Sequence, residues 1–541
     1  RIVLRATRVY AIVAEQAATA DALTDVTRRA VALEQLARSA LLAPPGHWTW
    51  EVFGAELIDL DNLDIPYFDV SLGSATIDSA AGPIAGVLHG DADSLTTAQQ
   101  RVAELSEADL AWQCRLIRGS IRSRYVRMSG GQQLGPARVD APPAYDPEQV
   151  VQTVFDAISA GAIDNGRGNF TWLTLSLLPD GDRVLLSLVG DSLYDGRIGI
   201  AAFQDMVRAT GPRNLTEVTL RPVWERADAS ESSARHRFVR NLGIGWTGLG
   251  GLLRLWDVPA FARLCDTAVA ALTPNHIAGD RTFDLLGGVA GLIGPLARRQ
   301  RHHPDAHTAH LLRLAAQHLA AAQFADGGWP FREASGPLTG LSHGASGMGM
   351  AMIEAGVALD HADFIAAGVR AFDFERAHFD EARGNWPDFR HHALGPDGQP
   401  TAMVAWCHGA PGIGLARLQA LTLLPDHPDA EVWRSELDVA MTTTLTSPLG
   451  TLDHLCCGNL GRAAVLQIAG SAMAQQQWLH AADTITAEVL ARAMADGRFR
   501  FPYDDPDTTG AQSPGFMNGL AGVGAHVWTS SRAGHLGAIL M

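Results

Sequence analysis

Apolar residues recur at helical spacing along most of the chain, and the clearest amphipathic stretches predict helices at 18–42, 259–272 and 308–324. Residues 1–125 are predicted to be helical, with one helix running from the Ser94 region to about Ile121. Alternating residues 171–177 and 184–189 flank the turn-rich segment 179–182 and predict a β-hairpin. The pattern thus predicts an all-α protein with one small hairpin.

A Gly-x-x-Gly motif recurs seven times in similar apolar settings, and successive first glycines are 40 to 65 residues apart. Each interval has room for two helices and their loops, so the repeat predicts an α/α toroid of seven helical hairpins. The inner helices would begin at these glycines and direct their positive N-terminal ends toward one face. The pairs are Gly196/Gly199, Gly248/Gly251, Gly288/Gly291, Gly344/Gly347, Gly409/Gly412, Gly458/Gly461 and Gly519/Gly522.

The glycine pairs could instead be dinucleotide-binding fingerprints, but none follows a strand in a βαβ unit. All 42 basic residues are arginine, and the chain has no lysine, which excludes Walker A and protein-kinase ATP sites. The net charge of −16 argues against a nucleic-acid partner, because a phosphate backbone requires a basic face.

At 541 residues the chain exceeds a typical single domain, and the Gly- and Pro-rich stretch 127–146 predicts a linker. We therefore expect domains at 1–126 and 147–541. Five cysteines without regular spacing favour a cytoplasmic protein. Cys114 and Cys265 lie in apolar helical patterns and are predicted to be buried. No apolar run is long enough for stable membrane insertion.

The other three cysteines are candidate metal ligands, because they occur in two consecutive repeats beside the glycine pairs. A single buried cysteine would be interpreted as structural, but three at matching positions favour metal binding. Thiolates suit zinc, and three protein ligands leave the open fourth position of a catalytic site. A substrate thiol bound there would lose its proton. The residues are Cys407 in Trp406-Cys407-His408-Gly409, and Cys456 and Cys457 in Leu455-Cys456-Cys457-Gly458.

Histidines and an aspartate stand at comparable places before other glycines of the repeat. His343 precedes Gly344 and is a candidate acid or base, although a lone histidine is often a satisfied core residue. Asp284 is a candidate partner that would orient His343, with helix capping as the alternative. His408, next to Cys407, is a candidate catalytic or supporting residue.

These motifs resemble the lanthionine cyclase family, which includes free-standing LanC proteins and the C-terminal domain of class II lanthipeptide synthetases of the LanM type. The resemblance covers residues 150–541, and residues 1–125 are similar to the end of the LanM dehydratase domain. The motifs that carry it are Leu193-Tyr194-Asp195-Gly196, Gly288-Val289-Ala290-Gly291, Ser342-His343-Gly344, Trp406-Cys407-His408-Gly409, Cys456-Cys457-Gly458, Asn518-Gly519-Leu520-Ala521-Gly522 and, in the first part, Arg5-Ala6-Thr7-Arg8-Val9-Tyr10 and Asp64-Ile65-Pro66.

The resemblance implies that Cys407, Cys456 and Cys457 bind Zn²⁺, with Cys457 where much of the family has histidine. It implies that His343 protonates the enolate carbon or assists thiol deprotonation, supported by Asp284. Free-standing cyclases carry an arginine four residues before the first ligand, but Met403 stands there. The elimination arginine and threonine would correspond to Arg1 and Thr7, whereas the phosphorylating residues that use ATP and Mg²⁺ would precede Arg1.

The reaction expected from the resemblance is the addition of peptide cysteine thiols to dehydroalanine or dehydrobutyrine, which forms lanthionine or methyllanthionine rings. The partner would be a precursor peptide with a leader and a dehydrated core. Two alternatives remain open at this point. The protein could add glutathione or another external thiol to dehydroamino acids, or it could be a non-catalytic zinc toroid that binds peptides.

Overall fold

The structure, a computed structural model, divides into two compact units, residues 1–113 and 114–541. The predicted linker lies outside the described residues except for 144–146, so the predicted domain boundaries stay a prediction. The described residues are 4–71, 74, 76–87, 94–123, 144–164, 169–177, 184–207, 215–228, 238–331, 334, 336–395, 398–502, 512–532 and 534–541.

The first unit is a small helical bundle with a buried ionic contact at its centre. Glu56 is fully buried, and its carboxylate accepts hydrogen bonds from Arg5 Nε (2.6 Å) and from the Tyr10 hydroxyl (2.7 Å). These bonds satisfy a charge that would be costly to bury alone. The unit contains α1 (Thr7–Ala17), α2 (Ala20–Thr24), α3 (Val26–Leu41), α4 (Trp48–Asp61), β1 (Ile77–Ser79), β2 (Gly82–Ile84) and α5 (Ser94–Ala103).

Three sequence expectations for residues 1–125 are wrong. The helix predicted at 18–42 is interrupted at Asp25, which follows α2 and caps α3 with its side chain. Strands β1 and β2 form an antiparallel hairpin where only helix was predicted. The predicted helix from Ser94 to about Ile121 is two helices, α5 and α6 (Glu107–Arg122). The chain breaks between them because Ser106 Oγ accepts the backbone N–H of Asp109 at 3.1 Å and so caps a new helix.

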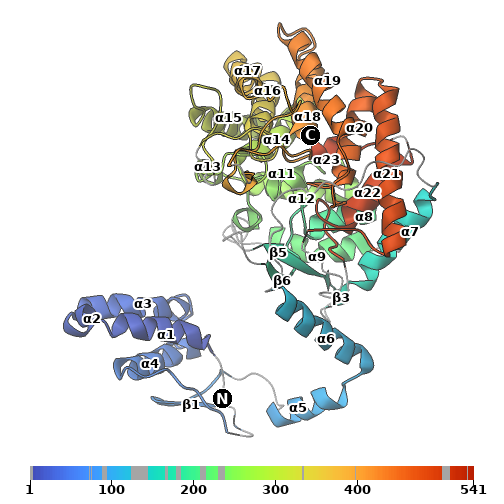
Figure 1. Cartoon of the computed structure of the whole chain (residues 1–541). Coiled ribbons are helices and arrows are strands. Elements are labelled where there is room, and N and C mark those ends of the chain that lie inside the picture. The colour runs from blue at the N-terminus through green and yellow to red at the C-terminus, as the bar shows by residue number, and fades with distance from the viewer. Residues whose placement is uncertain are drawn as a thin grey trace. The chain divides into compact units, whose positions relative to one another are not determined.

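In the second unit, an inner layer of helices is arranged in sequence order (Figure 1). From α11 onward each inner helix contacts the next, and α22 contacts α8, so the last returns to the first. This is the predicted α/α toroid. The inner helices are α8 (Arg197–Met206), α11 (Leu249–Leu253), α14 (Val289–His302), α16 (Ala345–Leu359), α18 (Ala410–Leu423), α20 (Asn459–Ala472) and α22 (Leu520–Ser530).

Each inner helix pairs with one outer helix. Six of the outer helices follow their partners in the chain, whereas α22 pairs with α7, which precedes the whole repeat. The predicted hairpin is confirmed as β5 (Leu173–Leu177) paired with β6 (Val184–Leu188), next to β3 (Ile163–Asp164) and β4 (Phe170–Thr171). The outer helices are α7 (Pro147–Ala160), α9 (Leu215–Ala227), α12 (Pro259–Ala271), α15 (Ala306–Ala321), α17 (Ala362–Ala377), α19 (Ala430–Thr446) and α21 (Gln476–Asp496).

The glycine pairs set the geometry of the inner helix N-termini. The first glycine of every pair is the N-cap of an inner helix. The second lies in the first helical turn, directly under a carbonyl of the preceding loop. A Cβ at Gly347 would lie 2.0 Å from the Leu341 oxygen, and one at Gly412 would lie 2.1 Å from the Trp406 oxygen. The loop therefore folds tightly onto its helix, and only glycine leaves the space.

We expect Gly347→Ala to lower the free energy of unfolding by about 2 kcal/mol or more, because the new methyl group overlaps a backbone carbonyl that cannot move alone. Gly190→Ala is the control, since a Cβ there meets nothing within 4 Å. Denaturant unfolding of both variants measures the difference. Equal stability of the two variants would contradict the tight approach.

Candidate metal centre

The turns that precede the inner helices are joined to one another by backbone hydrogen bonds. Each of these bonds runs from an amide of one turn to a carbonyl of the next turn, at the same end of the toroid. The links are Trp246 N to Leu285 O (2.9 Å), Leu286 N to Ser342 O (3.2 Å), Leu341 N to Cys407 O (3.1 Å), Cys407 N to Cys456 O (3.4 Å), Cys456 N to Met517 O (2.9 Å) and Met517 N to Tyr194 O (2.7 Å).

These links bring the three candidate ligands together from two turns. The sulfur atoms of Cys407, Cys456 and Cys457 all lie within 4.8 Å of one another. The Sγ atoms of Cys407 and Cys457 are 3.1 Å apart, and those of Cys457 and Cys456 are 3.4 Å apart. Within the described residues, no other group of three or more such side chains could hold a metal ion.

The donor set fits a zinc ion. Ligands about 2.3 Å from zinc in a tetrahedron lie roughly 3.8 Å apart, so a slight separation of the sulfur atoms accommodates one ion. Cys407 and Cys456 are 4% and 3% exposed, whereas Cys457 is partly exposed. Three thiolates would occupy three positions and leave the fourth for a ligand from solvent.

Without a metal, the pKa values of the three thiols differ from one another. Hydrogen bonding with Cys407 and Cys456 lowers the pKa of Cys457 well below the usual value, so Cys457 ionises first. Hydrogen bonds to Cys407 and Cys457, together with burial, raise the pKa of Cys456. A negative charge thus concentrates on the cysteine that is the most exposed of the three residues.

His343 and Asp284 form a close pair near the sulfur cluster. The Asp284 carboxylate is 1% exposed and lies 2.6 Å from His343 Nδ1, and its other oxygen accepts the Gly287 N–H at 2.7 Å. Asp284 thus contacts His343 and its own turn at once, but it does not cap α14, whose N-cap Gly288 has no side-chain cap hydrogen bond. Its supporting role in catalysis stays a prediction. The bond to Nδ1 leaves His343 Nε2 as the nitrogen available to other groups, and the ring is 26% exposed.

The turn that carries His343 is fixed from beneath by a buried carboxylate of α17. Glu375 Oε1 accepts the N–H groups of Gly340 (2.8 Å) and Ser346 (3.0 Å), one on each side of His343. Arg417 of α18 pairs with Glu375 at 2.9 Å, and both side chains are fully buried. The histidine is thus held by main-chain anchors rather than by its own contacts alone.

His408 lies next to Cys407 in the sequence and near the ring of His343. Its ring centroid is 5.7 Å from that of His343, and its Nε2 lies 3.1 Å from Ser342 Oγ. Burial and the nearby Arg390 lower the pKa of His408 to about 4, so the ring is neutral at pH 7. His454, three residues before Cys457, is buried with Nδ1 3.1 Å from the Met517 carbonyl oxygen, a contact typical of a core histidine.

Arg390 is a candidate site residue that the sequence patterns did not single out. Although burial lowers it, hydrogen bonds to Asp388 and the neighbouring sulfur atoms of Cys407 and Cys457 raise the pKa of Arg390. Its Nη2 lies 2.5 Å from Asp388 Oδ2 and 3.4 Å from the sulfur of Met403. Met403 has no charge, but its sulfur contacts the guanidinium of Arg390, which comes from a different part of the chain.

Tyr194 is a second residue that was missed. Burial, followed by its neighbours Cys456 and Cys457, raises the pKa of Tyr194 well above the usual value, so its hydroxyl stays protonated beside the cluster. A signal was present in the sequence, because Tyr194 stands two residues before Gly196. Cys407 and Cys456 have the same position relative to Gly409 and Gly458.

The remaining candidates lie elsewhere. Thr7 is an exposed residue at the start of α1 in the first unit, and Arg1 lies outside the described residues. Their elimination role stays a prediction. Cys265 is buried as expected, whereas Cys114 is partly exposed, so its predicted burial is wrong.

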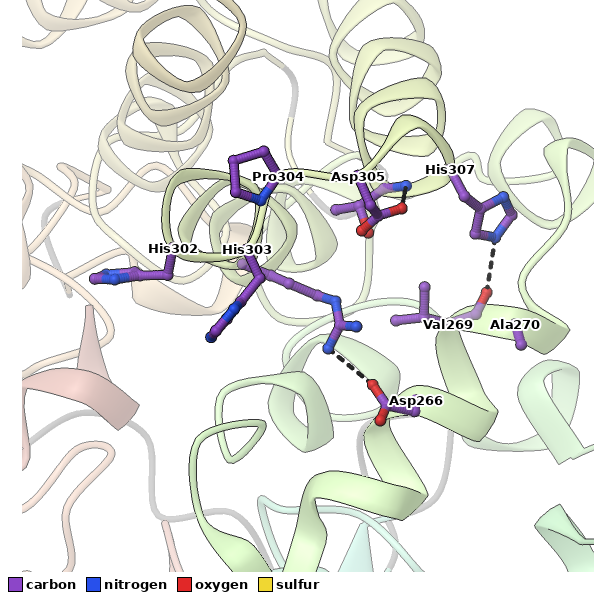
Figure 2. A pocket seen from close by; sticks show the side chains of 10 residues that line it. Asp266, Val269, Ala270, His302, His303, Pro304, Asp305 and His307 are labelled. Atoms are coloured by element: carbon purple, nitrogen blue, oxygen red, sulfur yellow. Dashed lines mark hydrogen bonds and ion pairs between the residues drawn. The ribbon is translucent and has the colours of Figure 1, made fainter.

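A separate pocket of about 650 Å³ lies between α12, α14 and α15 (Figure 2). Arg299 pairs there with Asp266 at 2.9 Å, and His307 Nε2 lies 3.3 Å from the Val269 carbonyl oxygen. The pocket is at the C-terminal end of α14, whereas Asp284 is at its N-terminal end, roughly 20 Å away along the helix axis. It is distinct from the sulfur cluster.

Comparisons with known proteins indicate the family of the chain. The family model described as "Lanthionine synthetase C-like protein" matches residues 187–532, and "Domain of unknown function (DUF4135)" matches residues 1–71. No curated protein matches the chain.

Among solved structures, the chain is similar to one titled "Nisin cyclase", at 14% identity and a TM-score of 0.49, covering 73% of this chain and 96% of that chain. A possible member of the GH105 family from Salmonella enterica has 11% identity and a TM-score of 0.39, covering 74% and 99%. An unsaturated glucuronyl hydrolase from Bacillus sp. GL1 has 10% identity and a TM-score of 0.35, covering 55% and 84%.

The family match spans well over half of the residues, so the chain belongs to the lanthionine synthetase C-like family. This membership supports a cyclase enzyme of lanthipeptide biosynthesis. The order of the two matches, with the DUF4135 region first, fits the LanM-type lanthipeptide synthetase that the motifs predicted.

Within the described residues, no helix is both long and apolar enough to cross a lipid bilayer.

In metal-free protein, we expect iodoacetamide to label Cys457 before the other cysteines of the cluster, because the thiolate is the reactive form and its pKa is lowered. Labelling should already be substantial near pH 7, about 1.5 units below an ordinary thiol pKa. Cys265 is the control, since burial raises its pKa. Peptide mapping by mass spectrometry across the pH range gives the order, and earlier labelling of Cys456 would contradict it.

Proposed function

We propose that residues 147–541 form a zinc-dependent lanthionine cyclase domain, which joins peptide cysteines to dehydroalanine or dehydrobutyrine. The observation that carries the proposal is the grouping of three sulfur atoms within 4.8 Å of one another, beside the His343–Asp284 pair. A structural zinc site would usually close with four protein ligands, whereas this one offers three. The open position and the adjacent acid–base pair favour catalysis.

Cys407, Cys456 and Cys457 would hold the zinc ion. When bound, zinc supplies a positive centre that lowers the pKa of a peptide thiol in the fourth position, so that the thiol reacts as a thiolate. In the reaction, the sulfur forms a bond to the β-carbon of the dehydroamino acid. The electron pair of the carbon–carbon double bond moves toward the carbonyl oxygen and gives an enolate.

His343 would complete the reaction by delivering a proton to the enolate α-carbon. Asp284 lies 2.6 Å from Nδ1, so it fixes the orientation of the ring and leaves Nε2 to face the substrate. The thiol loses one proton and the carbon gains one, which leaves the total mass of the peptide unchanged. Holding both reacting groups in one bound peptide supplies a further acceleration, because the two ends of the new bond are already close.

Arg390 would offset the negative charge of the site. Three thiolates on one divalent ion carry a net charge of about −1, and a bound peptide thiolate adds another. Arg390 lies close enough to Cys407 and Cys457 for the charges of their sulfur atoms to raise its pKa. Asp388 holds it in place through its carboxylate.

Residues 1–126 would be the C-terminal part of a LanM-type dehydratase domain, a domain that uses ATP and Mg²⁺ to phosphorylate and eliminate Ser and Thr before cyclisation. His408, which is buried and neutral, would support the zinc site from its position next to Cys407. The partner would be a precursor peptide with a leader and a dehydrated core, and the protein would act in the cytoplasm.

A pre-dehydrated precursor peptide incubated with the zinc-loaded chain should lose free thiols without a change of mass, as counted by alkylation and mass spectrometry. Cys457→Ala should abolish this loss while the melting curve stays close to that of the wild type. A product heavier by the mass of glutathione, when glutathione is supplied, would instead indicate addition of an external thiol. Unchanged thiols with one bound zinc ion would contradict the cyclase assignment, and global unfolding of Cys457→Ala would indicate a structural metal.

His343→Gln should lower kcat about 100-fold or more, because general acid–base catalysis contributes a factor of about 10² to 10⁴. Zinc content should remain near one ion per chain, since His343 is not a ligand. His318→Gln is the matched control. His318 lies on α15, and its Nε2 is 3.1 Å from the Asp280 carbonyl oxygen. Cyclisation kinetics and metal analysis of both variants test the role. Full activity of His343→Gln would exclude it.

A further inference from the structure

The segment of residues 536–541 packs three apolar side chains into the core of the toroid, whereas Ala538 is exposed. It forms the short helix α23 (Gly537–Leu540), which is labelled near the chain end in Figure 1. Leu536, Ile539 and Leu540 are 2%, 4% and 0% exposed. The core of the toroid is therefore filled in part by residues that belong to none of the hairpins.

Two consecutive carbonyl groups of this segment receive the indole N–H groups of two buried tryptophans. Trp406 Nε1 donates to the Leu540 oxygen at 3.1 Å, and Trp246 Nε1 donates to the Ile539 oxygen at 3.2 Å. Both tryptophans are fully buried, and their rings lie 5.7 Å apart. Because a buried N–H needs a partner, these bonds fix the positions of both rings relative to the segment.

Trp406 belongs to the turn that supplies a metal ligand. Cys407 is the next residue, and the Trp406 carbonyl oxygen packs against the site where Gly412 lacks a side chain. A displaced Trp406 ring would therefore shift the Cys407 sulfur relative to the two sulfur atoms supplied by the neighbouring turn.

Trp246 reaches the other half of the site. Its backbone N–H donates to the Leu285 oxygen at 2.9 Å, and the next amide, of Thr247, donates to the Leu286 oxygen at 2.9 Å. Leu285 directly follows Asp284, whose carboxylate holds His343. Trp246 is thus one main-chain contact away from the acid–base pair.

We propose that residues 536–541 are a positioning element that sets Cys407 through Trp406 and Asp284 through Trp246. The first half of the proposal is the link through Trp406 to Cys407, which concerns metal geometry and needs no assumption about the reaction. The second half is the link through Trp246 to Asp284, which rests on the proposed cyclase function. One short segment thereby fixes the spacing between the metal ligands and the proton donor, although it contributes no side chain to either.

Trp406→Phe tests the first half, because it keeps an aromatic ring but removes the N–H that donates to Leu540. We expect the dissociation constant for zinc, measured by competition with a chromogenic chelator, to rise about 10-fold or more, as for other groups that orient metal ligands. In the cobalt-substituted protein, the visible absorption bands should shift, since they report the geometry of the thiolate ligands.

Trp329→Phe is the matched control. Trp329 is equally buried, and its Nε1 donates to the Leu319 carbonyl oxygen at 2.8 Å, at the end of α15 and not in a metal-binding turn. We expect it to lower the melting temperature as much as Trp406→Phe does, with unchanged zinc affinity and unchanged cobalt bands. Equal zinc affinity and equal cobalt bands in the two variants would overturn the proposal for Trp406.

Trp246→Phe tests the second half. It should leave the zinc affinity and the cobalt bands unchanged but lower the kcat of cyclisation and displace its pH profile, because the Asp284 turn moves. A normal kcat and pH profile would overturn this half. If the wild-type chain fails to cyclise any peptide, the proposed function fails, whereas the zinc and cobalt measurements on Trp406→Phe still decide the first half.

A variant lacking residues 537–541 provides a second route that leaves both tryptophans in place. It should weaken zinc binding at least as much as Trp406→Phe, with circular dichroism used to verify that the helices remain. A helical deletion variant with wild-type zinc affinity and cobalt bands would overturn the positioning role of the segment.

Discussion

The architecture of the site depends on one close approach, in which a loop carbonyl rests on the second glycine of each inner helix. At Gly461 the space is so small that a Cβ would lie 1.8 Å from the Leu455 oxygen, and at Gly522 it would lie 1.7 Å from the Phe516 oxygen. This contact makes every turn fold back in the same way, so neighbouring turns present amides and carbonyls at matching heights. The sulfur atoms meet because the turns that carry them are joined by those groups.

Local patterns explain how much could be predicted from the sequence. The glycine spacing marks where inner helices begin, since N-caps and close packing depend on residues a few positions apart. Cys407 and Cys456 could be grouped because they share a position in the repeat, and Cys457 is adjacent to Cys456. His343 and Asp284 were found in the same way, but their 2.6 Å contact joins different turns and required the structure.

The sequence did not predict residues that contact segments distant in the chain or that lie outside any repeating pattern. Arg390 lies in an irregular loop, and its relation to the sulfur atoms follows only from how that loop packs. The break before Glu107 was overlooked because Ser106 interrupts a pattern that otherwise continues as a helix. The carbonyls of Ile539 and Leu540 carry no sequence signal at all, because any residue offers a backbone oxygen.

The pairing of α22 with α7 joins two segments that are made far apart in time during synthesis. Residues 147–160 have to wait for their partner at 520–530, so the outer layer stays open on one side until those residues emerge. Contacts between segments so distant in sequence are slow to close, and exposed apolar surface in the interval favours aggregation. Met517, which accepts the Cys456 N–H, also follows all three cysteines in the sequence. The turn that carries Cys456 and Cys457 therefore gains its last main-chain partner only after the cysteines themselves have been made.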